Sequence, residues 1–234
     1  MKQNMIGDVP GNVLGMLSDL TSKLQHGKIT SRQFELFLKG KNPFVGEDDI
    51  LAEWTTLYCD YLGLTVDLSG VKIPEHKNGF DRIIIVAREL LMASNGRPYT
   101  HVIEAMKKHF PVWTYSDDLN KVIVKNDRWP DKSSYTVRFR DRVEADEELK
   151  NRSADDLAKD GISGITCLER LLYELKYFAE TGKNLDIDNW TLCSGSRCSA
   201  GSVPGVDFGG GGVRVGWCPS SGARSRLRSR SVAV

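Results

Sequence analysis

Hydrophobic positions in the first part of the chain recur at three- and four-residue spacings, which is the period of an amphipathic helix. One such stretch covers residues 12–25. A second opens at Thr30, which has Gln33 at the spacing of a capping box, and a third covers residues 48–63. The pattern predicts a helical N-terminal module over residues 1–79.

From residue 66 onward, β-branched runs indicate strands that belong to one sheet. The predicted strands lie at 66–74, 80–87, 112–115, 122–126 and 135–143. Three further helices are expected among and after them. Thr100 is expected to cap one that closes at Pro111, Ser153 caps a short one, and Thr166 with Glu169 forms a capping box for the longest.

The strictest period-two alternation lies near the C-terminus. In VPGVDF and VRVGWC, apolar residues alternate with small or polar ones, which gives the predicted strands one apolar face. Removing the Trp217 side chain should cost about 3 to 5 kcal/mol if the ring is fully buried. Changes at Arg214 or Ser221 should alter stability by less than about 0.5 kcal/mol. The expected inward scaffold consists of Val206, Phe208, Val213, Val215, Trp217 and Leu227.

The opposite face and the adjoining loops hold small or polar residues, which are the candidate ligand-binding positions. A Gly/Ser linker has a similar composition, but a linker does not place valine, phenylalanine and tryptophan at strict period two. The candidate positions are Cys198, Ala200, Ser202, Gly205, Asp207, Gly209, Gly210, Gly211, Arg214, Gly216, Cys218, Ser220, Ser221, Gly222, Ala223, Arg224, Ser225 and Arg226.

Composition separates the same region from the rest of the chain. Residues 194–234 contain 9 Gly, 9 Ser and 6 Arg, one acidic residue, and no Lys, Glu, Gln or Met. This segment carries a formal charge of +5 and residues 1–193 carry −4. The net charge of +1 is therefore the sum of a basic segment and an acidic one. The whole chain, with 40% hydrophobic and 27% charged residues, has an ordinary globular composition.

Other composition signals narrow the class of protein. The chain has no run of about 18 apolar residues, and its first residues lack the basic start and apolar core of a signal peptide. We therefore expect a protein without a membrane segment, cytoplasmic by default. The five cysteines are an odd number without CxxC spacing, which favours free thiols over a disulfide framework or a structural zinc site.

Several long motifs resemble the variable proteins of bacterial diversity-generating retroelements. The motifs are SYTVRFRDRVEADEELKNRSADDLAK at 134–159, GITCLERLLYELKYFAETGKNLD at 164–186, TLCSGSR at 191–197, and then GSVPGVDF, VRVGW, LRSR and SVAV. The resemblance implies a C-type-lectin-like fold, related in shape to the formylglycine-generating enzymes. We therefore expect an α+β protein with mixed small sheets and two or more helices, in which residues 80–234 form this domain and 198–231 its diversified region.

The resemblance also implies a restricted set of amino acids at diversified positions. In this family, adenines of template codons are replaced at random, and asparagine codons then reach Gly, Ser, Arg, Cys, Asp and Ala but never Lys, Glu, Gln, Met or Trp. All candidate positions fit that set, and Trp217, which does not, falls on the expected scaffold face. The implied function is non-enzymatic ligand recognition without a cofactor. Arg214, Arg224 and Arg226 are the expected anchors for a carboxylate- or phosphate-bearing macromolecule, with protein expected before nucleic acid.

The remaining candidate metal-binding and acidic groups are expected to have structural or solvent-exposed roles. Calcium-dependent sugar binding needs several oxygen ligands, and the tail has one carboxylate. The acidic run EADEE at 144–148 is expected to be a solvated helix start or loop. The four histidines, at 26, 76, 101 and 109, lack the mutual spacing of metal ligands, so no metal site is expected.

Two alternative functions remain open. A thiol enzyme of the formylglycine-generating type would use Cys193 with Cys198, or Cys198 with Cys218, but no histidine lies in the last 125 residues to act as a base. Alternatively, the SRLRSRS segment would bind nucleic acid through phosphate contacts without sequence preference. The sequence does not predict the oligomeric state.

Overall fold

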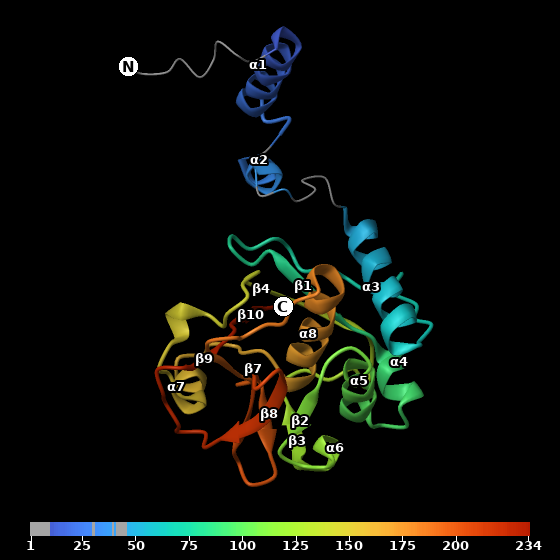
Figure 1. The fold of residues 1–234 in the computed structure, drawn as a ribbon, viewed down its shortest axis with the longest axis vertical. Helices are drawn as coiled ribbons and strands as arrows, with labels where there is room; N and C mark the ends of the chain where they lie inside the picture. Colours follow the sequence, from blue (N-terminus) through green and yellow to red (C-terminus); the bar gives the residue numbers. More distant parts are fainter. Residues whose placement is uncertain (1–9, 30, 39, 41–45) are drawn as a thin grey trace. The chain divides into compact units, whose positions relative to one another are not determined.

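The computed structural model describes residues 10–29, 31–38, 40 and 46–234 (Figure 1). The chain divides into two compact units, Met1–Ile50 and Leu51–Val234. The described residues form both helices and sheets, so the predicted α+β class is confirmed.

The first unit contains two helices, α1 (Gly11–Gln25) and α2 (Ser31–Leu38). Both occur where the three- and four-residue spacing predicts them. None of the residues of α1 is buried, and Leu14 and Leu17 are exposed despite their place on its apolar stripe. Thr30, the expected cap of α2, lies outside the described residues.

Helix α3 (Glu47–Leu62) belongs mainly to the second unit, so the predicted module boundary at residue 79 is wrong. Trp54 and Tyr58 of α3 are buried in this unit. The Tyr58 hydroxyl donates a hydrogen bond to the carbonyl of Ile85 and accepts one from the amide of Ala87, each at 2.9 Å. Helical periodicity shows that a face is apolar, but it does not show which core that face joins.

The described residues form three sheets, and the expectation that the strands between residues 66 and 143 share one sheet is wrong, because β2, β3 and β4 each belong to a different sheet. The first sheet has the order β1-β4-β10 and is antiparallel, the second has the order β2-β8-β7-β5-β9, and β3 pairs with β6. In the second sheet β2 and β9 run parallel to their neighbours. The strands are β1 (Arg82–Val86), β2 (Val112–Thr114), β3 (Ile123–Asn126), β4 (Tyr135–Phe139), β5 (Trp190–Leu192), β6 (Ser196–Cys198), β7 (Val203–Gly209), β8 (Gly212–Cys218), β9 (Leu227–Ser229) and β10 (Val232–Ala233).

Two local predictions fail for identifiable reasons. Residues 66–74 form no strand; two of their carbonyls accept hydrogen bonds from side chains of β4 instead, Lys72 from Thr136 Oγ1 at 2.7 Å and Pro74 from Arg138 Nε at 2.6 Å. Helix α5 (Pro98–Lys107) begins at proline, whose fixed φ suits the first helical turn, so Thr100 lies inside the helix and does not cap it.

Helix α8 (Cys167–Thr181) lies at the centre of the core of the second unit, and its residues 167–176 are all buried. Thr166 and Glu169 form the predicted capping box, and Gly182 ends the helix with a φ of 66°. Helix α8 contacts β1 of the first sheet, β7 of the second, and α5 (Figure 1). The shorter helices are α4 (Arg88–Ala93), α6 (Leu119–Val122) and α7 (Ala154–Lys159), and the last has the predicted Ser153 cap.

A buried network of charges joins α8 to the C-terminal strands. Arg170 Nε donates to Asp186 at 2.9 Å, Arg170 Nη1 donates to Glu174 at 2.6 Å, and Arg230 Nη2 donates to Asp186 at 2.6 Å. All four side chains are 0% exposed. Because isolated charges are costly inside a protein, these residues depend on one another for their burial.

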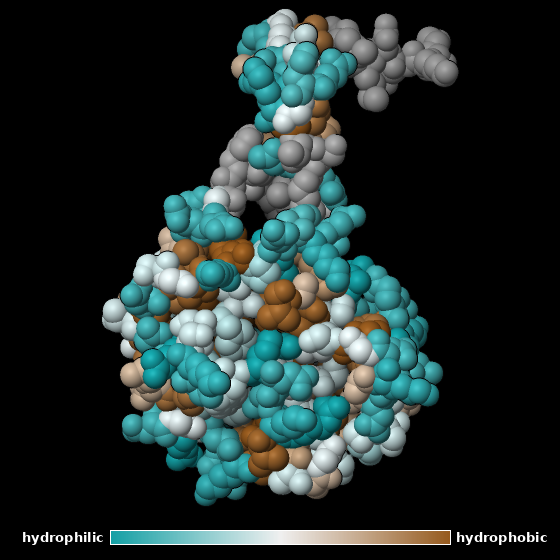
Figure 2. Space-filling view, turned by 180° about the vertical axis from the view of Figure 1, so that it is seen from behind, coloured by the Kyte–Doolittle hydropathy of each residue, from teal (hydrophilic) through white to brown (hydrophobic). Residues whose placement is uncertain are grey.

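The surface of the described chain shows no large apolar area on the side drawn in Figure 2. Hydrophobic residues of the second unit lie there in small patches separated by hydrophilic ones. Scattered apolar residues of this kind are ordinary for a protein surface. Among the described residues, no helix is long and apolar enough to cross a membrane.

Candidate functional site

The β7–β8 hairpin presents two different faces, and its register follows the predicted alternation. Val206 pairs with Val215, and Phe208 pairs with Val213, so these side chains share one face. The three valines are at most 2% exposed. They form part of the scaffold as predicted, whereas Phe208 is partly exposed.

The opposite face of this hairpin is partly covered, which the sequence pattern does not indicate. Trp190 of β5 lies over two glycines that pair across the strands: a Cβ atom on Gly205 would lie 3.2 Å from its ring, and one on Gly216 3.1 Å. Real Cβ atoms rarely come so close. Gly205 is therefore a packing position beneath an aromatic ring, and its assignment as a ligand contact is wrong.

Asp207 and Arg214 form an ion pair on that same face. Arg214 Nε donates to Asp207 Oδ1 at 3.0 Å, Arg214 Nη2 donates to Oδ2, and the guanidinium lies 5.5 Å from the centre of the Trp190 ring. Asp207 is 1% exposed, so its assignment as a ligand contact is also wrong. Arg214 keeps a half-exposed side chain, but its donors face Asp207, which weakens its case as a free anchor.

Trp217, predicted to lie in the core, is 55% exposed. Its backbone pairs with Pro204 on the valine face, near the open end of the hairpin. Alternation fixes the face of a residue but not how far the core extends along the strand. Leu227 is buried as predicted, although in a separate cluster with Ala154, Leu192 and Val203.

A hollow of about 490 Å³ lies beside Trp217, and several candidate positions line it. One wall is the loop after β6, with Ala200 and Ser202, and another is the loop after β8, with Ser220 and Ser221. Tyr115 and Val122, from the middle of the chain, complete the lining with Cys198. Two loops of restricted composition, 20 residues apart in sequence, therefore meet around fixed aromatic side chains.

Cys198 contributes to this hollow mainly through its contact with Tyr115. The two residues share a hydrogen bond of 3.0 Å between the Tyr115 hydroxyl and the Cys198 sulfur, and Cys198 is only 6% exposed. Burial and the contact with Cys198 raise the pKa of the Tyr115 hydroxyl, so it stays protonated at neutral pH. Cys198 is therefore part of the wall, and the prediction that it lies on an open ligand-facing surface is wrong.

The remaining candidate positions are accessible to differing degrees. The hairpin turn Gly209–Gly211 lies at the opposite end of β7 and β8 from Trp217, so the candidate surface does not form one continuous face. Partly exposed positions are Ser202, Gly209, Arg214, Gly216, Cys218, Ser220 and Gly222. Fully exposed positions are Ala200, Gly210, Gly211, Ser221, Ala223, Arg224, Ser225 and Arg226.

Two of the four arginines between residues 224 and 230 form ion pairs within the protein. Arg228 Nη1 lies 2.5 Å from Glu147, and Arg230 belongs to the buried network with Asp186. Arg224 and Arg226 remain exposed. Because phosphate binding needs several accessible cations, the tail offers less to nucleic acid than its sequence indicates.

The acidic run at 144–148 is structural rather than merely solvated. Glu144 accepts hydrogen bonds from the backbone amides of residues 187, 188 and 189, at 2.9 to 3.1 Å. Asp146 pairs with Arg140 at 2.6 Å, and Glu148 pairs with Arg142 at 2.6 Å. The described residues contain no group of three or more metal-ligating side chains.

Two of the cysteines considered for a thiol enzyme, Cys193 and Cys218, lie in surroundings that do not activate a thiol. Burial raises the pKa of the Cys193 thiol well above its usual value, and burial also raises that of Cys218. A catalytic thiol needs a lowered pKa and a nearby base. Neither of these two thiols has the lowered pKa that a nucleophile needs.

Sequence reasoning missed three aromatic residues near the candidate positions: Trp113, Tyr115 and Trp190. Trp113 is 46% exposed on β2, next to Arg214 in the register of β8. The run VWTY at 112–115 held the available signal, since alternate positions of a strand share one face and Trp113 and Tyr115 therefore lie on the same side. No protein-family model, curated protein or solved structure matches the chain.

Proposed function

We propose that this protein recognises a protein ligand without covalent chemistry, through a hypervariable surface on a C-type-lectin-like scaffold that a retroelement diversifies. The observation that carries the proposal is the hollow beside Trp217. Loops 199–202 and 219–226 have the restricted composition of diversified positions, and residues 199–202 and 219–221 line the hollow together with Trp217 and Tyr115. Tryptophan, tyrosine and arginine dominate binding energy at protein interfaces.

In this proposal the fixed aromatic side chains and the variable loop side chains have different roles. Trp217 and Tyr115 supply fixed aromatic contact area, and the loop side chains around them change specificity without disturbing the core. Arg224 and Arg226 are the accessible cations and suit a ligand surface that carries carboxylates. The proposed mechanism needs no cofactor, metal ion or turnover.

Deep sequencing of this locus across a cell population tests the proposal, with any adjacent adenine-rich near-copy taken as the template. Substitutions are expected at the exposed loop positions, and they should correspond to template adenines. Val206, Val213 and Val215 serve as internal controls and should not vary. An invariant loop without a template, or equal variation at the three valines, would overturn the proposal.

The two glycines beneath Trp190 add a second, more specific expectation to this experiment. Gly205 and Gly216 lie beneath Trp190, so folded variants should accept only the smallest residues there, whatever the template permits. Exposed Ala200 and Ser221 have no such limit. Folded variants with large side chains at both glycines would contradict this expectation. They would show that the strand face, and not the loops, is the main variable surface.

A further inference from the structure

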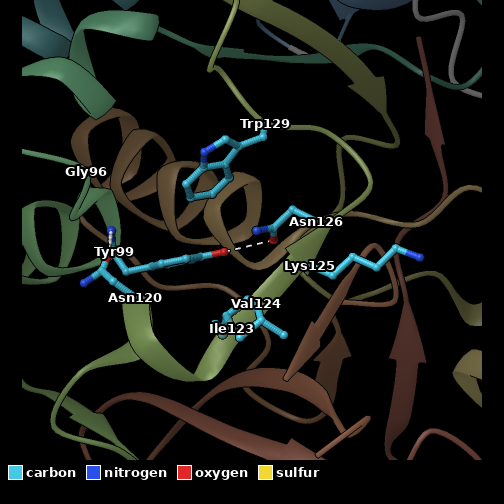
Figure 3. Close-up of a pocket in the computed structure, with 8 residues that line it drawn as sticks. All are labelled: Gly96, Tyr99, Asn120, Ile123, Val124, Lys125, Asn126 and Trp129. Carbon is cyan, nitrogen blue, oxygen red and sulfur yellow. Dashed lines mark hydrogen bonds between the residues drawn. The ribbon is translucent and has the colours of Figure 1, made fainter. Parts of the chain in front are cut away.

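A second cavity, of about 510 Å³, lies between α5, α6 and β3 (Figure 3). None of its lining residues falls within the proposed diversified region, so every variant of the protein would keep it. The side chains that define it are Tyr99, Asn120, Ile123, Val124, Asn126 and Trp129.

Two aromatic rings form one wall of this cavity. The centres of the Tyr99 and Trp129 rings are 5.9 Å apart, with their planes inclined by 37°. Tyr99 is 1% exposed and supports the wall from behind, whereas Trp129 is partly exposed. Ile123 and Val124 add apolar surface below the rings (Figure 3). The cavity therefore offers a flat ring a surface on which to stack.

The orientation of the Asn126 amide is set by its partners. Its oxygen accepts hydrogen bonds from the Tyr99 hydroxyl at 3.0 Å and from Ser196 Oγ at 2.6 Å. Ser196 Oγ in turn accepts from the amide of Cys167, the first residue of α8, at 2.9 Å. Burial raises the pKa of Tyr99 well above its usual value, which keeps this hydroxyl a donor.

These bonds leave the Asn126 nitrogen as the group that faces the cavity. A carbonyl oxygen has two lone pairs, and both are occupied here, so the Nδ2 atom must point the other way. Figure 3 shows it directed into the space between the Trp129 ring and the Tyr99 hydroxyl. The cavity thus presents a fixed hydrogen-bond donor beside an aromatic surface.

The other polar lining groups are already engaged or turned away. Asn120 accepts a hydrogen bond from the amide of Tyr99 and donates to Thr100 and Asp118. Lys125, the one charged residue among those that line the cavity, extends its ammonium group away from the rings (Figure 3). The space between the rings and Asn126 therefore favours an uncharged ligand that supplies an acceptor.

We propose that this cavity binds a small, uncharged, planar ring compound that carries a carbonyl oxygen. The ring stacks on Trp129, and the carbonyl oxygen accepts a hydrogen bond from Asn126 Nδ2. This site is separate from the hollow beside Trp217, so it does not depend on the proposed recognition function.

Fluorine NMR of the full chain labelled with 5-fluorotryptophan tests the assignment, with nicotinamide as the probe. The chain has five tryptophans, and Trp129→Phe identifies the signal of Trp129. Nicotinamide should shift this signal saturably and leave that of Trp217 in place. The matched compound 3-methylpyridine has the same ring without the carbonyl group, and it should bind at least about tenfold more weakly, the effect of one hydrogen bond to a buried donor.

Asn126→Asp tests the donor directly. The carboxylate still accepts from Tyr99 and Ser196 but cannot donate, so nicotinamide affinity should fall about tenfold or more. Trp217→Phe is the control and should leave nicotinamide binding unchanged. If the other fluorine signals show that Asn126→Asp is misfolded, Trp129→Leu replaces it, with broadening of the nicotinamide proton signals as the measurement.

Three results would overturn the assignment. They are no saturable shift of the Trp129 signal, equal binding of nicotinamide and 3-methylpyridine, and an unchanged affinity in Asn126→Asp. Saturable binding of methyl glucoside without binding of nicotinamide would likewise overturn it, since it would show a sugar site.

Discussion

Trp217 lies on the same face of the hairpin as the buried valines, but its side chain is largely exposed to water. Its substitution should therefore affect stability less than substitution of a buried valine on that face. Trp217→Ala should lower the free energy of unfolding by less than about 1 kcal/mol, because more than half of the side chain is already in water. Val206→Ala, on the same face but fully buried, should cost about 2 kcal/mol. Urea denaturation of both variants measures the contrast, and equal losses would contradict it.

Arg214 matters for stability in a way that its exposure does not indicate. Its removal leaves the Asp207 carboxylate buried without a partner, so Arg214→Ala should cost about 1 to 3 kcal/mol instead of the small change expected from the sequence. The double variant with Asp207→Ala should recover part of this loss. Urea denaturation of the three proteins measures the effect, and a loss under about 0.5 kcal/mol for Arg214→Ala would refute it.

At the scale of elements, Asp186 connects α8 to the C-terminal strands. It accepts hydrogen bonds from Arg170, Arg230 and the amide of Ala145. Asp186→Asn should lower the free energy of unfolding by about 3 to 5 kcal/mol, because it removes the carboxylate whose negative charge balances two buried guanidinium groups. Thermal unfolding followed by circular dichroism measures the loss. Arg224→Ala, an exposed charge change, is the control and should have almost no effect.

The hairpin turn between β7 and β8 depends on backbone conformation. Gly210 and Gly211 have φ values of 64° and 88°, as a two-residue hairpin turn of the primed type requires. Gly210→Ala should cost about 1 to 2 kcal/mol, whereas Gly210→Asn should cost clearly less, since asparagine tolerates positive φ. Chemical denaturation distinguishes them, and equal stability of the two variants would exclude this explanation.

The sequence predicts best those elements whose cause is local. The capping boxes at Ser153 and Thr166 and the register of the β7–β8 hairpin all depend on residues a few positions apart, and the structure confirms them. The burial of Gly205 depends instead on Trp190, from a strand inserted between β7 and β9. A one-dimensional pattern contains no information on which distant strand becomes a neighbour, so the covered part of the candidate surface could not be predicted.

At the scale of the whole molecule, the second unit has its own core and should fold without the first. Removal of residues 1–45 keeps all of α3 and should change the free energy of unfolding by less than about 1 kcal/mol, because α1 contributes no buried residue. Thermal and urea unfolding of the shortened and full chains measure the difference. A loss of several kcal/mol would show that the first unit supports the second.

The same scale explains why the sequence predicts the fold class but not the boundary between the two units. The α+β class follows from the periods of the segments, and the structure confirms it. The boundary between units depends on where Trp54 and Tyr58 of α3 pack, and a helix of either unit has the same apolar stripe. The hollow beside Trp217 likewise joins three separate parts of the chain, of which the composition marked two.

The last two strands of the chain follow the loop at 219–226, so a chain that ends or changes reading frame within this loop lacks them. Strands β9 and β10 follow the loop at 219–226, and they carry Arg230 into the core and complete two of the three sheets. A frameshift or premature stop inside that loop therefore deprives Asp186 of a partner and exposes two sheet edges. Such a product is expected to be less stable than the full chain and more exposed to edge-to-edge association and degradation.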